Sequence, residues 1–266
     1  MKFGFIGCGN MGGALASAVA KSMEKSEIAV CDAFAEKAEA FAKEHGVTVS
    51  DTVTVAKKAQ YIFLGVKPQV FESLFAEIAP ILKERTDDFV LVSMAAGISI
   101  SAVEKMAACD PKVIRIMPNT PVSVGAGVIL YSVNAKVTQQ NVAEFRKALS
   151  AAGVVDPIPE DKIDAASALS GCGPAFVALF AEALADGAVE CGLPRDKAAL
   201  YAAQTILGTA QLILESGKHP GQIKDAVCSP GGTTIEGVHA LEKGKFRAAS
   251  MNAVTAAYEK TLKLKK

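Results

Sequence analysis

The stretch Phe3-Gly4-Phe5-Ile6-Gly7-Cys8-Gly9-Asn10-Met11-Gly12 decides the fold expected of this chain. A short apolar run leads directly into glycines spaced G-x-G-x-x-G, and a helical pattern follows over residues 10–20. In that context the glycines form a tight turn, let the backbone approach a pyrophosphate, and allow a helix to pack closely on a strand. Residues 7–12 are therefore predicted to bind a dinucleotide.

Short β-branched runs alternate with Ala-rich, helical patterns over the first part of the chain. Such alternation is typical of α/β proteins and predicts an N-terminal Rossmann-type, doubly wound parallel sheet. The runs expected to form strands are residues 3–6, 28–31, 61–66, 89–93 and 113–116.

The segment Asp156-Pro157-Ile158-Pro159-Glu160 ends this alternation. Beyond it the chain is helical by pattern, with Gly and Pro at the expected helix ends. Residues 175–188 carry Ala almost all round a helix, which favours packing on several sides, as at a subunit interface. We expect a dinucleotide-binding domain over residues 1–158 and an all-α, substrate-binding and dimerisation domain over residues 159–266.

Composition favours small-molecule chemistry. The chain has 266 residues, of which 50% are hydrophobic, and its 28 basic and 28 acidic residues cancel, so no net field attracts nucleic acid or an anionic membrane. A strand begins directly after Met1, which predicts no cleaved leader and a cytoplasmic location. Residues 116–135 lack charge, but their prolines and glycines argue against a membrane span. The six scattered cysteines predict reduced thiols and no metal site.

Further cofactor contacts are expected outside the carboxyl ends of the strands. Asp32 ends the second run, where an acid bonds the ribose hydroxyls of NAD and repels a 2′-phosphate. Asp32 thus favours NADH over NADPH, but Lys37 and Asp51, further along the chain, can change this preference, so both cofactors stay open. Asp32 also suits a turn or helix cap. The other expected cofactor residues, which also suit ordinary turns, are Val66, Lys67, Pro68, Ala95, Ala96, Gly97 and Asn119.

The stretch Ser229-Pro230-Gly231-Gly232-Thr233-Thr234 is predicted to be an anion-binding loop at a helix start. Its two glycines free the backbone to present N–H groups, and Thr233 with Glu236 has the spacing of a capping box. A helix N-terminus with free donors suits a carboxylate or a phosphate. An ordinary Pro-Gly turn before a capped helix is the alternative.

Five motifs, in this order and spacing, resemble the pyrroline-5-carboxylate reductase family: residues 7–12, 66–68, 117–121, 170–176 and 229–235. The resemblance runs through essentially the whole chain. It implies reduction of 1-pyrroline-5-carboxylate to L-proline by NADPH or NADH, the last step of proline biosynthesis. It also implies obligate homodimers through the helical domain, often assembled further into a ring of dimers such as a decamer.

The resemblance also implies roles for single residues. It places the substrate carboxylate against Ser229, Gly231, Gly232 and Thr233, and the hydroxyl of Thr234, the expected catalytic residue, near the ring nitrogen. Family members commonly have Ser at the position of Cys172 and an aromatic hydroxyl at that of Phe176, so hydrogen bonds from those hydroxyls do not carry over.

The residues also suit the reduction of an imine. A cyclic imine arrives protonated and chiefly needs orientation beside the nicotinamide, whereas a ketone needs a positioned acid. Residues 163–196 contain neither Lys nor His, although related hydroxyacid dehydrogenases use a lysine on the corresponding helix. Glu182, Asp186 and Glu190 share a helix face, where we expect a solvated or interface stripe. Another imine or hydroxyacid reductase, and a dinucleotide-binding regulator without turnover, stay open as alternatives.

Overall fold

The computed structural model describes residues 1–264, which form two compact units. Within the described residues, the first unit contains Met1–Gly171 and residues 258–264, and the second contains Cys172–Ala257.

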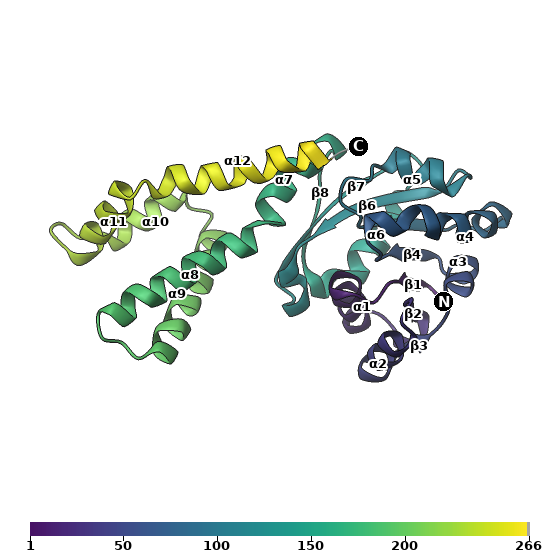
Figure 1. Ribbon diagram of the computed structural model, residues 1–266, viewed down its shortest axis with the longest axis horizontal. Coiled ribbons are helices and arrows are strands. Elements are labelled where there is room, and N and C mark those ends of the chain that lie inside the picture. The colour runs from purple at the N-terminus through teal and green to yellow at the C-terminus, as the bar shows by residue number, and fades with distance from the viewer. Residues whose placement is uncertain (265–266) are drawn as a thin grey trace. The chain divides into compact units, whose positions relative to one another are not determined.

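One eight-stranded sheet forms the centre of the first unit (Figure 1). Its order is β3-β2-β1-β4-β5-β6-β7-β8, and neighbouring strands are parallel except for the antiparallel pair β6 and β7. The predicted doubly wound α/β sheet is confirmed. The strands are β1 (Phe3–Ile6), β2 (Ile28–Cys31), β3 (Thr48–Val49), β4 (Tyr61–Leu64), β5 (Val90–Ser93), β6 (Lys112–Pro118), β7 (Gly127–Val133) and β8 (Gly153–Pro157).

Helices cover both faces of this sheet, which is why β1, β2, β4 and β5 are buried along their whole lengths. Helices α1, α2 and α6 pack on one face, and α3, α4 and α5 pack on the other. Their bounds are α1 (Asn10–Ser22), α2 (Ala35–His45), α3 (Thr52–Lys58), α4 (Phe71–Glu84), α5 (Ile100–Ala107) and α6 (Gln139–Ala148).

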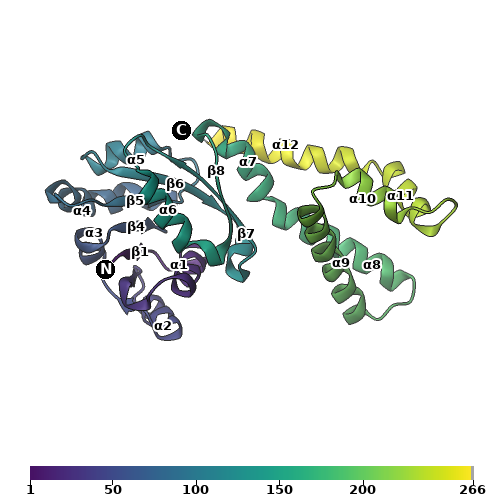
Figure 2. The same ribbon diagram turned by 180° about the vertical axis from the view of Figure 1, so that it is seen from behind.

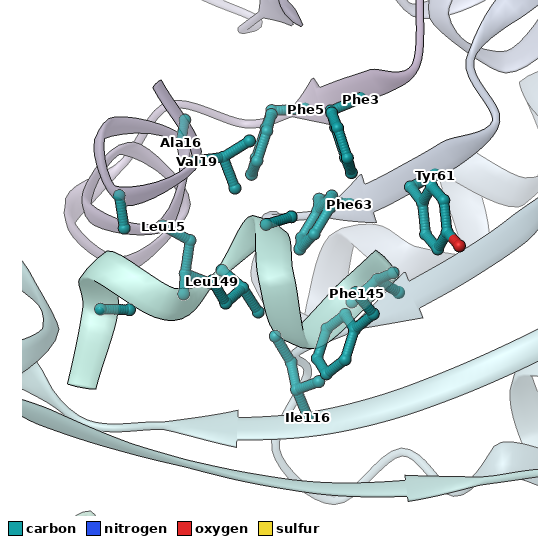
Figure 3. Close-up of a cluster of buried hydrophobic side chains, with 14 of the residues drawn as sticks. Phe3, Phe5, Leu15, Ala16, Val19, Tyr61, Phe63, Ile116, Phe145 and Leu149 are labelled. Atoms are coloured by element: carbon teal, nitrogen blue, oxygen red, sulfur yellow. The ribbon is translucent and has the colours of Figure 1, made fainter. Parts of the chain in front are cut away.

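The neighbouring strands β1 and β4 carry stacked aromatic rings on the α1 and α6 face (Figure 3). Phe3 stacks on Tyr61 with a centroid distance of 5.4 Å, and Phe5 stacks on Phe63 at 4.4 Å. Between the two phenylalanines, Gly4 points to the opposite face, where a Cβ would lie 2.5 Å from the side chain of Val55. The absent side chain lets α3 lie directly on β1.

Several predicted element ends differ from the observed ones. The first two strands have the predicted bounds, whereas β4 ends at Leu64 instead of residue 66. Gly65, which follows β4, lies so close to the glycine loop that a Cβ there would be 2.6 Å from the oxygen of Gly7. The predicted run 113–116 proves too short, because β6 pairs with β7 from Ile114 to Pro118.

Helix α7 (Ile163–Ser170) belongs to the first unit although it follows the proline-rich segment. The buried Arg115 of β6, 3% exposed, lies 3.1 Å from Glu160 and 3.5 Å from Asp164. Glu160 also accepts a hydrogen bond of 2.8 Å from the backbone N–H of Ile100. Packing therefore divides the chain after Gly171, whereas the predicted domain boundary follows residue 158.

The second unit is helical, and Figures 1 and 2 both show α8 and α9 side by side. Its buried apolar cluster consists of three alanines, Ala185, Ala198 and Ala202, while large apolar side chains on α8 and α9 are exposed. The chain by itself thus leaves an apolar surface here. The helices are α8 (Gly173–Glu190), α9 (Arg195–Ser216), α10 (Pro220–Val227), α11 (Thr233–Lys243) and α12 (Phe246–Leu264), the last of which runs into the first unit.

Candidate functional site

The glycine loop between β1 and α1 leaves the start of the helix open. Gly7 has a φ of +102°, and a Cβ at Gly12 would lie 2.1 Å from the oxygen of Gly7, so both positions require glycine. Gly9 caps α1 without a side-chain hydrogen bond, and a Cβ there would meet no atom of the described chain within 4 Å. The N–H groups at this helix start therefore have room for a pyrophosphate, and residues 7–12 fit the predicted role.

The other predicted cofactor segments follow strands parallel to β1, at the same edge of the sheet. Strand β1 lies between β2 and β4, where the strand order reverses, and such a switch point is where open α/β sheets bind ligands. The segments brought to this edge are Asp32 after β2, Val66, Lys67 and Pro68 after β4, and Ala95, Ala96 and Gly97 after β5.

Asp32 is held by two backbone donors. Its Oδ2 accepts the N–H of Cys8 at 2.7 Å, and its Oδ1 accepts the N–H of Phe34 at 3.0 Å. The second bond makes Asp32 a turn residue, as the alternative interpretation expected. Each carboxylate oxygen keeps a second lone pair, so the group can still accept a ribose hydroxyl.

Two thiols beside this loop stay uncharged at neutral pH. Burial, assisted by the charge of Asp32, raises the pKa of Cys8 to about 12. Burial also raises the pKa of Cys31 to about 11, and all six cysteines are free. A thiolate at Cys8 would repel a phosphate, so the raised pKa keeps the loop suitable for an anion.

Asn119 has an internal role in this chain. Its Nδ2 donates to the backbone oxygen of Ser170 at 2.9 Å, and its Oδ1 accepts the N–H of Val128 at 2.8 Å. The buried amide thus ties the end of α7 to the start of β7. Its expected contact with the cofactor stays a prediction.

The loop before α11 in the second unit also ends in an open helix start. Gly231 has a φ of +67°, the N–H of Gly232 donates to the oxygen of Ser229 at 3.0 Å, and Gly232 caps the helix. The predicted capping box is wrong, because Thr233 is already the first helical residue and no side chain caps the N-terminus among the described residues. The two glycines begin the helix one residue earlier than the T-x-x-E spacing indicates.

This geometry suits an anion better than a capping box would. The first backbone N–H groups of α11 can donate hydrogen bonds to a ligand, and the positive end of the helix dipole adds attraction for a carboxylate. A Cβ at Gly232 would lie 2.3 Å from Oγ of Ser229, so the serine hydroxyl lies directly against the helix start. Thr234 is half-buried in the first turn. The substrate contacts of Ser229, Gly231, Gly232, Thr233 and Thr234 stay predictions.

Comparison with known proteins identifies the family. The chain is 43% identical to pyrroline-5-carboxylate reductase 3 of Danio rerio, over 99% of this chain and 91% of that protein. The chain belongs to the pyrroline-5-carboxylate reductase family.

Solved structures agree with this membership. A pyrroline-5-carboxylate reductase from Coxiella burnetii superposes with a TM-score of 0.92 at 33% identity and covers 100% of this chain and 98% of its own. A Plasmodium falciparum pyrroline carboxylate reductase with NADP bound has a TM-score of 0.85 at 32% identity, over 100% of this chain and 98% of its own.

Two family models match different parts of this member of the pyrroline-5-carboxylate reductase family. Residues 2–97 match the family described as NADP oxidoreductase, coenzyme F420-dependent, and residues 160–264 match pyrroline-5-carboxylate reductase dimerisation. Within residues 1–264, the helical stretch Glu160–Glu190 is long and apolar enough to cross a membrane, by length and composition alone. That stretch lies within the segment that matches the dimerisation family.

One residue of the dinucleotide edge was missed by the sequence reasoning. Gly65 lies against the glycine loop, and a Cβ there would approach both the Gly7 oxygen, at 2.6 Å, and the Gly12 Cα, at 3.3 Å. A glycine directly after a buried strand was the available signal. No group of three His, Cys, Asp or Glu side chains within the described range could hold a metal ion, and the absence of a metal stays a prediction.

Proposed function

We propose that this chain reduces 1-pyrroline-5-carboxylate to L-proline with NADH or NADPH, as the last step of proline biosynthesis. Identity of 40% to 43% with pyrroline-5-carboxylate reductases over essentially the whole chain carries the proposal. The open helix starts at residues 7–12 and at residues 229–234 support it, since the cofactor and the substrate each bring an anionic group.

The proposed roles follow from the chemistry of the two sites. When bound, the nicotinamide supplies the hydride that the imine carbon receives. Residues 7–12 hold the pyrophosphate, and the loop of Ser229, Gly232 and Thr233 holds the substrate carboxylate. The hydroxyl of Thr234 lies near the ring nitrogen and fixes its position. Because the imine is already protonated when its carbon is reduced, this orientation replaces a lysine or histidine acid.

We also propose that the chain works as a homo-oligomer built on dimers, as a ring of dimers, in the cytoplasm, without nucleic-acid or membrane partners. The match of residues 160–264 to the dimerisation family supports the dimer. The zero net charge supports the expectation that nucleic acid is not a partner.

The deciding experiment is oxidation of NADH and of NADPH by the purified chain with 1-pyrroline-5-carboxylate, together with detection of L-proline. We expect imine-dependent oxidation and formation of the L-isomer. A folded chain that binds nucleotide but oxidises neither cofactor with this imine would overturn the proposal. Turnover of hydroxyacids instead would identify a hydroxyacid reductase.

Thr234→Val tests the substrate loop. The substitution keeps the shape of the side chain and removes the hydroxyl, so kcat/KM should fall roughly tenfold to a hundredfold, the range for losing a hydrogen bond to a charged group. Cofactor affinity should stay unchanged. Thr86→Val, at an exposed position of the first unit, is the matched control. Normal turnover of the Thr234 variant would remove this hydroxyl from the site.

A further inference from the structure

The turn after β2 presents a fixed negative charge at the dinucleotide edge. The carboxylate of Asp32 accepts N–H groups from Cys8, in the glycine loop, and from Phe34, in the next turn. Two backbone donors from different segments fix both oxygens in place, so the group cannot turn away from a ligand that enters beside the loop. Its remaining lone pairs suit the 2′- and 3′-hydroxyls of a ribose.

A second carboxylate lies close by. Asp51 follows β3 and caps α3, where it accepts the backbone N–H and the hydroxyl of Thr54, both at 2.7 Å. These hydrogen bonds lower the pKa of Asp51 and keep it ionised. The charges of Asp51 and Asp32 both raise the pKa of the Cys31 thiol, so both act on the same end of β2.

The basic side chains near this edge are exposed to solvent, whereas the carboxylate of Asp32 is half-buried. Recognition of a 2′-phosphate calls for a basic group near the end of β2, most effectively an arginine. Residues 32–38 contain one basic residue, Lys37, and its ammonium lies 4.8 Å from the ring centroid of Phe34, which is 66% exposed. Lys67, after β4, is exposed as well. Solvent screens these exposed charges more than it screens the half-buried Asp32.

We propose that Asp32, fixed by the N–H groups of Cys8 and Phe34, makes this enzyme prefer NADH to NADPH. The inference rests on the proposed function only for the identity of the second substrate. A 2′-phosphate would bring a second negative charge against Asp32, while a 2′-hydroxyl would donate to it. A relative with NADP bound does not set the preference of this chain, because the preference depends on the residues at the end of β2.

Binding measurements test the proposal without turnover. Isothermal titration with ADP-ribose and with 2′-phospho-ADP-ribose compares ligands that differ only in the phosphate. We expect the unphosphorylated ligand to bind at least about tenfold more tightly, as a like charge at close range predicts. The ratio of kcat/KM for NADH to that for NADPH, with the imine as substrate, should agree in direction.

Three variants complete the test. Asp32→Ser and Asp32→Asn should each shift the affinity ratio toward the phosphorylated ligand by roughly tenfold or more. Ala33→Arg adds a cation at an exposed position and leaves Asp32 intact, so it should raise affinity for the phosphorylated ligand even if the Asp32 variants fold poorly. Asp161→Asn, on the exposed surface of the first unit, should change nothing.

The outcomes separate this inference from the proposed function. Tighter binding of the phosphorylated ligand by the unmodified chain, or an unchanged ratio in a folded Asp32→Asn variant, overturns the role of Asp32. Imine reduction without any preference between cofactors also overturns it and leaves the proposed function intact. The expected binding preference without imine reduction supports Asp32 and overturns the proposed function.

Discussion

A valine at Gly12 and a valine at Gly9 have different expected effects, although both glycines belong to one loop. At Gly12 a Cβ would lie 2.1 Å from the Gly7 oxygen, so the backbone must shift, and overpacking of this kind costs typically about 1–3 kcal/mol of unfolding free energy. At Gly9 a Cβ would meet nothing within 4 Å in the described chain, so stability should hold. The valine would instead fill the space into which the pyrophosphate fits, and cofactor binding should disappear.

Thermal melting and cofactor titration of the two variants check this pair. We expect Gly12→Val to melt at a lower temperature than the unmodified chain, and Gly9→Val to melt normally and bind no cofactor. Retained cofactor binding in Gly9→Val would place the phosphates elsewhere.

The two buried thiols predict a loss of stability at alkaline pH. In the unfolded chain a thiol titrates at about pH 8.5, whereas the folded pKa values are about 12 for Cys8 and about 11 for Cys31. Above about pH 9 the unfolded state has therefore released protons that the folded state still holds, and the free energy of unfolding falls as the pH rises. The contribution is complete below that pH and disappears progressively toward pH 12.

Melting temperatures between pH 7 and pH 11 measure this effect. Cys8→Ala should lose less stability over that interval than the unmodified chain, whereas Cys191→Ala, at an exposed thiol, should follow the unmodified chain. Equal slopes for all three proteins would contradict the raised pKa of Cys8.

For single residues, prediction from the sequence succeeded where the spacing of the residues alone determines the backbone geometry. The G-x-G-x-x-G pattern requires only local backbone geometry, and the loop has the conformation that the pattern predicts. The hydrogen bonds of Asn119 were not predictable, because its partners at Val128 and Ser170 are set by how β7 and α7 pack.

At the scale of elements, the attachment of α7 to the sheet depends on a buried charge. Asp164→Ala removes one of the two carboxylates that face Arg115, and loss of a partner from a buried ion pair costs about 3 kcal/mol or more. Asp88→Ala removes the partner of Lys112 at an exposed site, where about 0–1 kcal/mol is expected. Denaturant unfolding at one protein concentration compares them, and equal effects would show that Arg115 does not hold α7.

Sequence patterns predict the ends of helices and strands less well than they predict that a helix or strand is present. The spacing of Thr233 and Glu236 is that of a capping box, yet Gly232 caps the helix, because the positive φ of Gly231 turns the chain one residue earlier. The prolines at 157 and 159 predict a domain boundary, which stays a prediction. The contacts of Arg115 with residues 160 and 164 depend on long-range packing that no local pattern reveals.

At the scale of the whole molecule, the apolar surface of α8 predicts dependence on a second subunit. Leu179 is 68% exposed in the single chain, and the buried cluster of its unit consists of three alanines. Leu179→Glu should convert the assembly to monomers at micromolar concentration and lower its melting temperature, because a carboxylate would have to be desolvated in the interface.

Light scattering coupled to size-exclusion chromatography checks the subunit count. Val154→Glu places the same charge at a 58% exposed valine outside the segment that matches the dimerisation family, and should leave the assembly unchanged. An intact dimer with glutamate at position 179 would move the interface away from this face of α8.

Helix α12 belongs to the second unit up to Ala257 and to the first unit beyond it, and this division affects how the first unit folds during synthesis on the ribosome. All eight strands come from residues 3–157, so the sheet can assemble while later parts of the chain are still being translated. Residues 258–264 also belong to the first unit, and they are synthesised only after the whole second unit. The first unit therefore begins to fold before the second unit has been translated, yet it is completed only after all of the second unit has been synthesised.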